Sequence, residues 1–397
     1  MSKGLTGLRV LDLSAALTGP YCSMILADQG ADVIKIEPPG GEIFRNLGPY
    51  YRGDWSAYFV GLHRNKRGVV LDLKTDGGLQ AFYDLVKLSD VVLDNFRPGV
   101  VQRLRIDHDT LSGLNPKIIT CSITGYGSEG SMKHRTAFDL AIQAASGVLS
   151  VTGTEEGEFV KTGVPVADLG AGMFAAIGIL TALNERSRSG IGQHVDISMF
   201  DVQISMLSYL VTWYTASGEV PRPLGTSHLG LVPYGAYKTK DGYLVWTIGT
   251  EDFWRELCRV LGMPELATDP RFNLVAKRQE NRAELKKILE DVLSQRTTAE
   301  WMVLMEEAGI PAAPVNRLDK ALAEPCVKER NMLVDLDQPG YGGPAKVFGN
   351  ALKLSRTPGE EFTPCPALGE HTVEVLSTVL GYPDEKIKEL YGCGAVA

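Results

Sequence analysis

The sequence predicts an α/β protein with two lobes, a large one built on a mostly parallel sheet and a smaller one of α+β type. Three observations lead to this prediction. The chain has 397 residues, and single domains average roughly 150 residues. In its first half, short apolar segments alternate with helical patterns, which is typical of a parallel sheet covered on both faces. A stretch rich in proline and glycine, residues 218–235, then interrupts this alternation.

The first elements predict a βαβ unit. Leu8–Leu13 is a strand pattern, Pro20 opens a helix, and Gly30 ends that helix before a second strand at residues 31–37. Proline suits the first helical turn because its missing N–H has no partner there, and glycine commonly follows the last helical residue. The pattern continues with strands at residues 68–73, 90–95 and 117–123 and a helix at 77–88.

The chain beyond residue 218 predicts the smaller lobe. Asp241-Gly242 separates two strand patterns within residues 235–249, and Asp-Gly is a strong hairpin signal. Helical patterns follow at residues 251–261, 281–294 and 298–308, and the chain closes with short strands near Val347 and Leu352 and helices near Thr372 and Glu385.

Composition excludes several classes of protein. The net charge of −8 gives no overall attraction to nucleic acid or to anionic lipid. Six dispersed cysteines and unpaired histidines predict no metal site and favour a reducing, cytoplasmic location. The longest uncharged apolar run, Leu169–Leu183, is shorter than the ~18 residues typical of a membrane span, and the N-terminus lacks a signal-peptide pattern. We therefore expect no nucleic-acid partner and no membrane segment.

The common nucleotide motifs of α/β enzymes are missing. The loop at residues 14–19 is not Gly-x-Gly-x-x-Gly, and the chain has neither a Walker loop nor a Gly-x-Ser-x-Gly elbow. Parallel sheets still bind ligands at the carboxyl ends of their strands. The loops at residues 14–19, 95–99 and 125–130 are therefore expected to converge on a site.

Basic residues gather in two stretches, residues 63–67 and the group Arg97, Arg103 and Arg105. The planar guanidinium of arginine makes paired hydrogen bonds to phosphate, so a phosphate-bearing ligand is one interpretation. A solvated basic face is the commoner outcome of such charge runs. Composition alone leaves both interpretations open.

Asp168 lies where a long apolar helix is expected to begin. A carboxylate there commonly caps the helix by accepting amide hydrogen bonds. It is also ionised at neutral pH and can act as a nucleophile if it faces a cleft. Position alone favours capping.

Motifs spread over nearly the whole chain resemble the class III CoA-transferases, which include formyl-CoA transferase. They are Leu5–Asp12 with Gly19-Pro20, Gly30–Glu37, Asn65-Lys66-Arg67, Asn95–Gly99, Gly190–Asp196, Pro233–Tyr237 and Asp241–Tyr243. The resemblance implies a Rossmann-like large domain of residues 1–200 joined by 326–397, a linker at 201–225, and a small α+β domain at 226–325. It also implies an interlocked homodimer.

The resemblance places the family's catalytic aspartate on Asp168 and assigns it as the nucleophile of CoA transfer. It implies CoA thioesters as substrates, with no permanently bound cofactor. CoA contacts would fall on Ala16, Leu17, Leu71, Asp72, Leu73, Lys74, Asn95, Phe96, Arg97, Arg103, Thr136, Ala137, Phe138 and Asp139. The basic stretches would then meet the phosphates of CoA.

The sequence departs from formyl-CoA transferase at four of its positions, which here are Leu17, Pro38, Thr136 and Phe138. We therefore expect another acid, with succinyl-CoA and a small dicarboxylate as one possible pair. A 2-methylacyl-CoA racemase is the alternative, with Glu251 and Asp168 at its acidic positions. Its histidine position is Phe138, which cannot transfer a proton. A non-catalytic CoA-binding protein is the third alternative.

Overall fold

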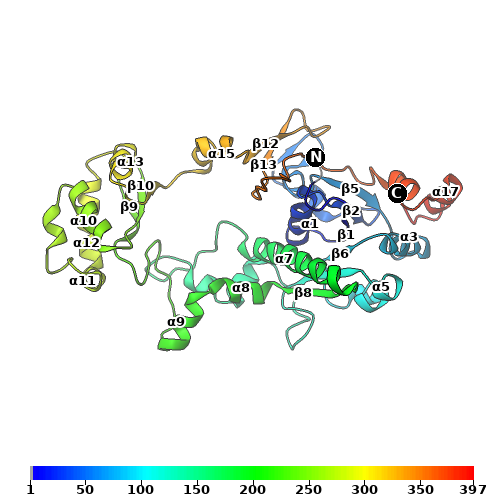
Figure 1. Ribbon diagram of the computed structural model, residues 1–397, viewed down its shortest axis with the longest axis horizontal. Helices are drawn as coiled ribbons and strands as arrows, with labels where there is room; N and C mark the ends of the chain where they lie inside the picture. Colours follow the sequence, from blue (N-terminus) through cyan, green and yellow to red (C-terminus); the bar gives the residue numbers. More distant parts are fainter. Residues whose placement is uncertain (1–2) are drawn as a thin grey trace. The chain divides into compact units, whose positions relative to one another are not determined.

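The computed structural model describes residues 3–397 and divides into two compact units. The first comprises Met1–Leu149, Lys161–Glu219 and Pro325–Ala397, and the second comprises Ser150–Val160 and Val220–Glu324. Figure 1 shows the elements of each unit.

A six-stranded sheet forms the centre of the first unit. Its strands are β1 (Arg9–Asp12), β2 (Asp32–Glu37), β5 (Lys66–Val70), β6 (Val91–Asp94), β7 (Ile119–Thr124) and β8 (His194–Ser198). They run parallel in the order β5-β2-β1-β6-β7-β8, so the predicted parallel sheet is confirmed. The strand order reverses between β1 and β6. Such a reversal opens a crevice at the carboxyl ends of the strands, where α/β proteins bind ligands.

Two helices cover one face of this sheet. α1 (Thr18–Asp28) and α7 (Val166–Ser189) pack on each other and on the strands through one apolar cluster. A side chain at Gly172 would place its Cβ only 2.7 Å from the carbonyl oxygen of Thr18. Glycine there allows α7 to approach the first turn of α1.

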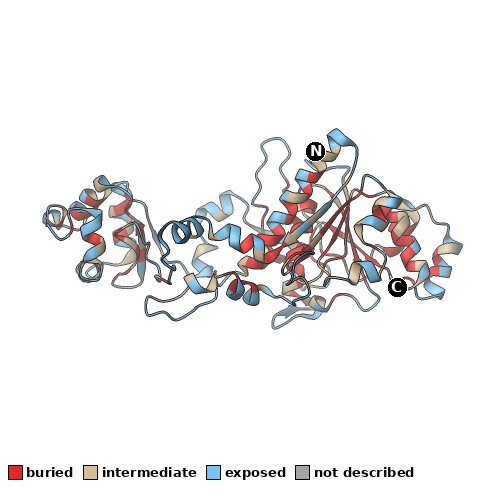
Figure 2. Ribbon diagram, turned by 90° about the horizontal axis from the view of Figure 1, so that it is seen from below, coloured by how far each residue is buried: buried red, intermediate tan, exposed pale blue. Residues whose placement is uncertain are grey.

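The opposite face is covered only in part, which corrects the expectation of two covered faces. α3 (Asp76–Lys87), α5 (His108–Leu114) and α17 (Asp384–Gly392) bury β5, β2, β1 and one side of β6 in a second cluster. Figure 2 shows the buried residues concentrated on the sheet and its helices. On β7 the apolar side chains point to α7, and Thr120 and Ser122 line an open cavity instead.

α7 is long and apolar enough by composition to cross a membrane, and it is the one such helix in the described part of the chain. Core helices of soluble proteins share these properties, and one such helix is weak evidence. Its residues Ala167, Ala171, Ala175 and Ile179 are fully buried within the first unit.

The second unit holds an antiparallel sheet of β9 (Tyr234–Lys238), β10 (Tyr243–Thr247) and β11 (Ala312–Pro314). The predicted hairpin is present, since β9 and β10 pair across Thr239–Gly242. Its helices include α10 (Glu251–Val260), α11 (Val275–Glu280), α12 (Arg282–Leu293), α13 (Thr298–Glu307) and α14 (Leu318–Ala321).

Smaller elements complete the first unit. They are β3 (Tyr51–Arg52), β4 (Trp55–Ser56), α2 (Ala57–Val60), α4 (Val100–Arg103), α6 (Asp139–Ala145), α8 (Met199–Leu207), α9 (Tyr209–Ser217), α15 (Pro325–Glu329), β12 (Leu333–Leu336), β13 (Ala345–Phe348) and α16 (Thr372–Glu374). The expected strand near Leu352 is absent because the segment after β13 is irregular.

Candidate active site

Asp168 is the third residue of α7 and does not cap it. The cap comes from Asp139, the first residue of α6. Its Oδ1 accepts hydrogen bonds from the backbone N–H groups of Ala167 at 2.9 Å and Asp168 at 3.4 Å. This corrects the capping interpretation of Asp168. Because another carboxylate satisfies these amides, the side chain of Asp168 is left available for a different partner.

That partner is Thr18, at the start of α1. Thr18 Oγ1 donates a 2.6 Å hydrogen bond to Asp168 Oδ1, and within residues 3–397 it is the one hydrogen bond recorded to this carboxylate. Burial raises the pKa of Asp168, the Thr18 hydrogen bond opposes that rise, and the nearby charge of Asp139 adds to it. A partly buried carboxylate with few hydrogen bonds is poorly solvated, and poor solvation favours nucleophilic attack.

The loop between β1 and α1 lies at the reversal of strand order and is held from the neighbouring strand. The side chain of Asn95, just after β6, accepts from Ala15 N at 2.9 Å and donates to Ala15 O at 2.7 Å. Ala16 has a φ of 68°, a left-handed conformation rare for residues other than glycine. The predicted residues Ala16, Leu17 and Asn95 therefore do come together, and Asn95 acts on the loop itself.

The first basic stretch is neither a solvated face nor a phosphate site. His63, Arg64 and Lys66 are almost fully buried. Arg64 binds both carboxylate oxygens of Asp28, and Lys66 lies 3.2 Å from Asp12. These acidic partners lie in other elements of the first unit, and they occupy the cations that the resemblance had assigned to CoA.

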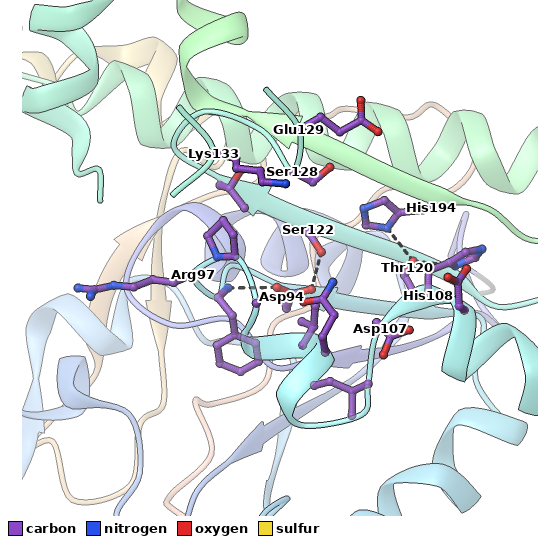
Figure 3. A pocket seen from close by; sticks show the side chains of 18 of the residues that line it. Asp94, Arg97, Asp107, His108, Thr120, Ser122, Ser128, Glu129, Lys133 and His194 are labelled. Carbon is purple, nitrogen blue, oxygen red and sulfur yellow. Dashed lines mark hydrogen bonds between the residues drawn. The ribbon is translucent and has the colours of Figure 1, made fainter. Parts of the chain in front are cut away.

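Of the second basic group, Arg97 borders the open cavity beside β7 (Figure 3). The cavity has a volume of about 510 Å³, and its lining includes Phe96, Arg97 and Lys133. At its floor, Asp94 accepts a 2.7 Å hydrogen bond from Ser122, and burial raises the pKa of Asp94 to about 6. Arg97 is exposed, so its guanidinium is accessible to a ligand.

Thr120 links two histidines on the same cavity wall. Its hydroxyl lies 2.9 Å from His108 Nδ1 and 2.8 Å from His194 Nδ1. Burial lowers the pKa of His194, so its ring favours the neutral form. The polar side of β7 and β8 therefore carries hydrogen-bonding groups in place of a helix contact.

The remaining predicted contacts differ in what they can offer. Leu71 is buried in the core, so only its backbone can meet a ligand. Asp72 caps the turn that follows by accepting from Lys74 N at 3.0 Å, and Lys74 is exposed. Leu73 and Phe96 pack against the second apolar cluster, and Arg103 ends α4. Thr136, Ala137 and Phe138 lead into α6 directly before Asp139.

Two further residues at this site, Thr18 and Tyr58, escaped prediction. Thr18 contacts Asp168 directly. Burial raises the pKa of Tyr58 to about 12, and the negative charges of Asp168 and Glu42 add to the rise, so Tyr58 is a protonated phenol close to both. Nothing local in the sequence marks these residues, because each acts on an element distant along the chain.

Within residues 3–397 no group of three or more His, Cys, Asp or Glu side chains is arranged to hold a metal ion.

The first unit therefore presents a partly buried carboxylate beside a loop at the carboxyl edge of a parallel sheet. It also presents an exposed arginine at a cavity whose lining does not include that carboxylate. Residues 5–372 match the family model of CoA-transferase family III, and the chain belongs to this family of CoA-transferases.

Two curated relatives and one crystal structure illustrate the family. The chain is 35% identical to human succinyl-CoA:glutarate CoA-transferase over 395 residues, covering 99% of this chain and 90% of that protein. It is 37% identical to succinyl-CoA:mesaconate CoA-transferase of Haloarcula hispanica over 380 residues, covering 94% and 95%. The CAIB/BAIF family protein from Brucella suis superimposes with a TM-score of 0.87 at 33% identity, covering 96% of this chain and 100% of that one.

Proposed function

We propose that this enzyme transfers CoA from succinyl-CoA to a small carboxylic or dicarboxylic acid, with Asp168 as the nucleophile. One observation carries the assignment of Asp168. Its helix is capped by Asp139, so its own carboxylate holds a single recorded hydrogen bond, from Thr18, at the edge of the sheet where ligands bind. The names of the two relatives support succinyl-CoA as donor.

The chemistry conserves the energy of the thioester through two kinds of covalent intermediate. Asp168 attacks the donor carbonyl, the C–S bond breaks, and CoA leaves as a thiolate with a mixed anhydride on Asp168. The thiolate then attacks the aspartyl carbonyl, which releases the donor acid and leaves an aspartyl-CoA thioester. The acceptor carboxylate repeats these two steps in reverse order and departs as the new CoA thioester. Dividing one acyl exchange into such steps lowers each barrier.

Arg97 and Arg103 are the proposed contacts for the phosphates of CoA, together with Lys74. They are exposed, unlike the buried cations of the first basic stretch. Ala16, Leu17 and the segment from Thr136 to Asp139 would contact the rest of CoA on the approach to Asp168. CoA enters as substrate, and no resident cofactor is proposed.

The racemase alternative requires two further acid–base groups besides Asp168, at the positions of Phe138 and Glu251, and neither residue is suited to that role. Phe138 has no proton to transfer. Glu251 begins α10 in the second unit and binds Arg278 through both oxygens, at 3.0 and 2.9 Å, which commits it to a structural ion pair. A non-catalytic CoA-binding protein would not require a partly buried carboxylate that holds a single hydrogen bond, as Asp168 does.

The test offers succinyl-CoA or acetyl-CoA with a panel of acids that includes glutarate and mesaconate, and detects new CoA thioesters by mass spectrometry. Hydroxylamine added during turnover should convert Asp168 to a hydroxamate. Asp168→Asn should abolish exchange, and Asp201→Asn, which changes a carboxylate in the first turn of α8, should not. Exchange that survives Asp168→Asn, or a hydroxamate on another residue, would overturn the proposal.

We also propose a homodimer of the interlocked kind. α7 carries an exposed apolar row at Met173, Ile177 and Leu180, with exposed fractions of 43%, 57% and 40%. These positions follow helical spacing and so share one face. Contiguous exposed apolar surface commonly marks an interface. Light scattering should show a dimer, and Ile177→Glu should weaken it; a monomeric wild type would contradict this.

A cytoplasmic location, without a nucleic-acid or membrane partner, is part of the same proposal. It is supported by six free cysteines within the described residues and by the net negative charge. Fractionation of cells that express the chain should place it with soluble proteins, and recovery in the membrane fraction would contradict it.

A further inference from the structure

A buried group of charges lies beneath the loop that carries Thr18 to Asp168. Lys35, Glu42 and His63 have side chains that are 1%, 4% and 1% exposed. Lys35 Nζ and Glu42 Oε2 lie 3.5 Å apart. Taking two charges out of water costs several kcal/mol for each ion unless their attraction and hydrogen bonds offset it. A buried ion pair therefore adds little net stability. The contacts of this pair indicate whether it has another role.

The contacts of this pair go to the loop at residues 14–18. Lys35 Nζ donates to the carbonyl oxygen of Ser14. Glu42 Oε2 accepts from the backbone N–H of Ala16 at 3.3 Å. Ala16 is the residue in the left-handed conformation, which must be held by its surroundings. One buried cation thus holds the loop at Ser14, and one buried anion holds it at Ala16.

His63 closes the group on its far side. Its Nε2 lies 3.1 Å from Glu42 Oε1. Burial lowers the pKa of His63 well below its ordinary value, and the charges of Lys66 and Lys35 lower it further, so the ring is neutral. Glu42 therefore has Lys35 as its buried cationic partner, and the charge of the pair balances.

The same loop ends at Thr18, whose hydroxyl contacts Asp168. Asn95 fixes Ala15 from the opposite side of the loop. Between these anchors only Leu17 separates Ala16 from Thr18, so displacement of Ala16 must be absorbed by the first turn of α1. A reacting group keeps its geometry only when the residues around it are themselves fixed.

We infer that the buried Lys35–Glu42 pair is a positioning element of the active site, which holds Ala16 and through Thr18 fixes the Asp168 carboxylate for attack. Lys35 and Glu42 touch neither CoA nor the acid in this inference; they act through the loop. The inference rests on the proposed role of Asp168 and adds Thr18 as the residue through which the pair acts.

The experiment is a double-mutant cycle between Thr18→Val and Glu42→Gln, read as kcat, KM and the pH dependence of kcat/KM. Each single variant should lower kcat by about 10-fold or more, the range expected for losing a hydrogen bond to a charged group. Each should move the acidic limb of the profile to higher pH, because the Thr18 hydrogen bond lowers the pKa of Asp168. Asp139 and Tyr58 also face this carboxylate and are left unchanged in every variant.

The double variant should be no slower than the slower single variant, because both changes remove the same interaction. The inference would be overturned if the kcat losses of the two single variants multiplied in the double variant. It would also be overturned if Glu42→Gln kept the acidic limb of wild type. Asp28→Asn is the matched control, since it breaks a pair equally buried, with Arg64, that has no contact with the loop. It should lower stability without moving the acidic limb.

Glu42→Gln leaves Lys35 as an uncompensated buried charge and can prevent folding. Lys35→Met with Glu42→Met removes both charges together, a change that is often neutral for stability. That folded protein should show the same loss of kcat and the same shift, and wild-type behaviour in it would overturn the inference.

A readout without turnover separates this inference from the proposed function. Carbodiimide modification of Asp168, followed by peptide mapping across pH, reports protonation of the carboxylate directly. Thr18→Val, Glu42→Gln and the protein with both Lys35→Met and Glu42→Met, here called the anchor variants, should shift that profile to higher pH. This shift should occur even if none of the donor and acceptor acids tested undergoes CoA exchange. If wild type exchanges CoA and Asp168→Asn does not, but the anchor variants match wild type in both profiles, the proposed function stands and this inference fails.

Discussion

Removing the distant cap of α7 is the sharpest test of how Asp168 is presented. In Asp139→Ala, Ala167 N and Asp168 N lose an acceptor, and so does Gln143 Nε2, which donates to Asp139 Oδ2 at 2.6 Å. Losing a helix cap costs about 0.5–2 kcal/mol. The Gln143 side chain is fully buried, and leaving its amide unpaired costs about 1–3 kcal/mol. We expect a total loss of about 1.5–5 kcal/mol and a fall in kcat.

Asp139→Asn separates the cap from the charge. An asparagine oxygen still accepts from the first amides of α7, although its NH₂ group opposes the NH₂ of Gln143. We expect a smaller loss of stability, about 1 kcal/mol. The charge of Asp139 contributes to the raised pKa of Asp168, so its removal should move the acidic limb of kcat/KM to lower pH.

Chemical denaturation and pH–rate profiles measure both effects. Thr297→Ala is the control, because Thr297 caps α13 in the second unit by accepting from Glu300 N at 3.3 Å. It should cost about 1 kcal/mol and leave activity unchanged. The reasoning is refuted if Asp139→Ala is no less stable than this control, or if the acidic limb of Asp139→Asn moves to higher pH.

Three further predictions concern charge. Asp168→Asn should unfold at a higher temperature than wild type at pH 7. Because the pKa of Asp168 is raised in the folded state, wild type loses stability as the pH rises through that pKa and the carboxyl ionises, whereas the asparagine variant does not. Below the ordinary pKa of 3.8 the two proteins should have similar stability. Asp94→Asn should likewise stabilise the protein above pH 6, by up to about 3 kcal/mol, since burial raises the pKa of Asp94 to about 6; equal stability in calorimetry at pH 8 would contradict this. Arg97→Ala should raise KM for the acyl-CoA by about 10-fold, and by less at high salt. Arg188→Ala, which changes an exposed arginine near the end of α7, should leave KM unchanged; equal KM values for the two variants would remove Arg97 from the CoA site.

Local pattern predicted the elements of the fold because each depends on neighbours along the chain. The strand before Pro20 and the hairpin at Asp241-Gly242 are examples. The open side of β7 was missed, although its alternation of Ile119, Cys121 and Ile123 with Thr120 and Ser122 is the period of a strand with one polar face. This two-residue period is the sequence signal that predicts a polar wall on one face of β7.

Residues of the candidate site could be predicted only where they belong to a motif shared with the family. The resemblance selected Asp168, but its hydrogen bond comes from Thr18, 150 residues away. The cap of its helix comes from Asp139 in another element. The charge run at residues 63–67 gave a wrong expectation for the same reason, because its partners Asp12 and Asp28 precede it by tens of residues. Charge pairing across a sheet leaves no mark in the local sequence.

The buried pairs and the exposed arginines divide the basic residues of the first unit by function. A cation whose partner lies within hydrogen-bond distance in the folded chain gains little from a phosphate, because binding would leave that partner unpaired. Arg64 and Lys66 are in this position, and Arg97 at the cavity is accessible. The division extends to the acids. Asp139 is committed to helix amides, whereas Asp168 is left with one hydroxyl and a partly buried carboxylate, and burial raises its pKa. Few hydrogen bonds and poor solvation are thus combined in the carboxylate that we propose as the nucleophile.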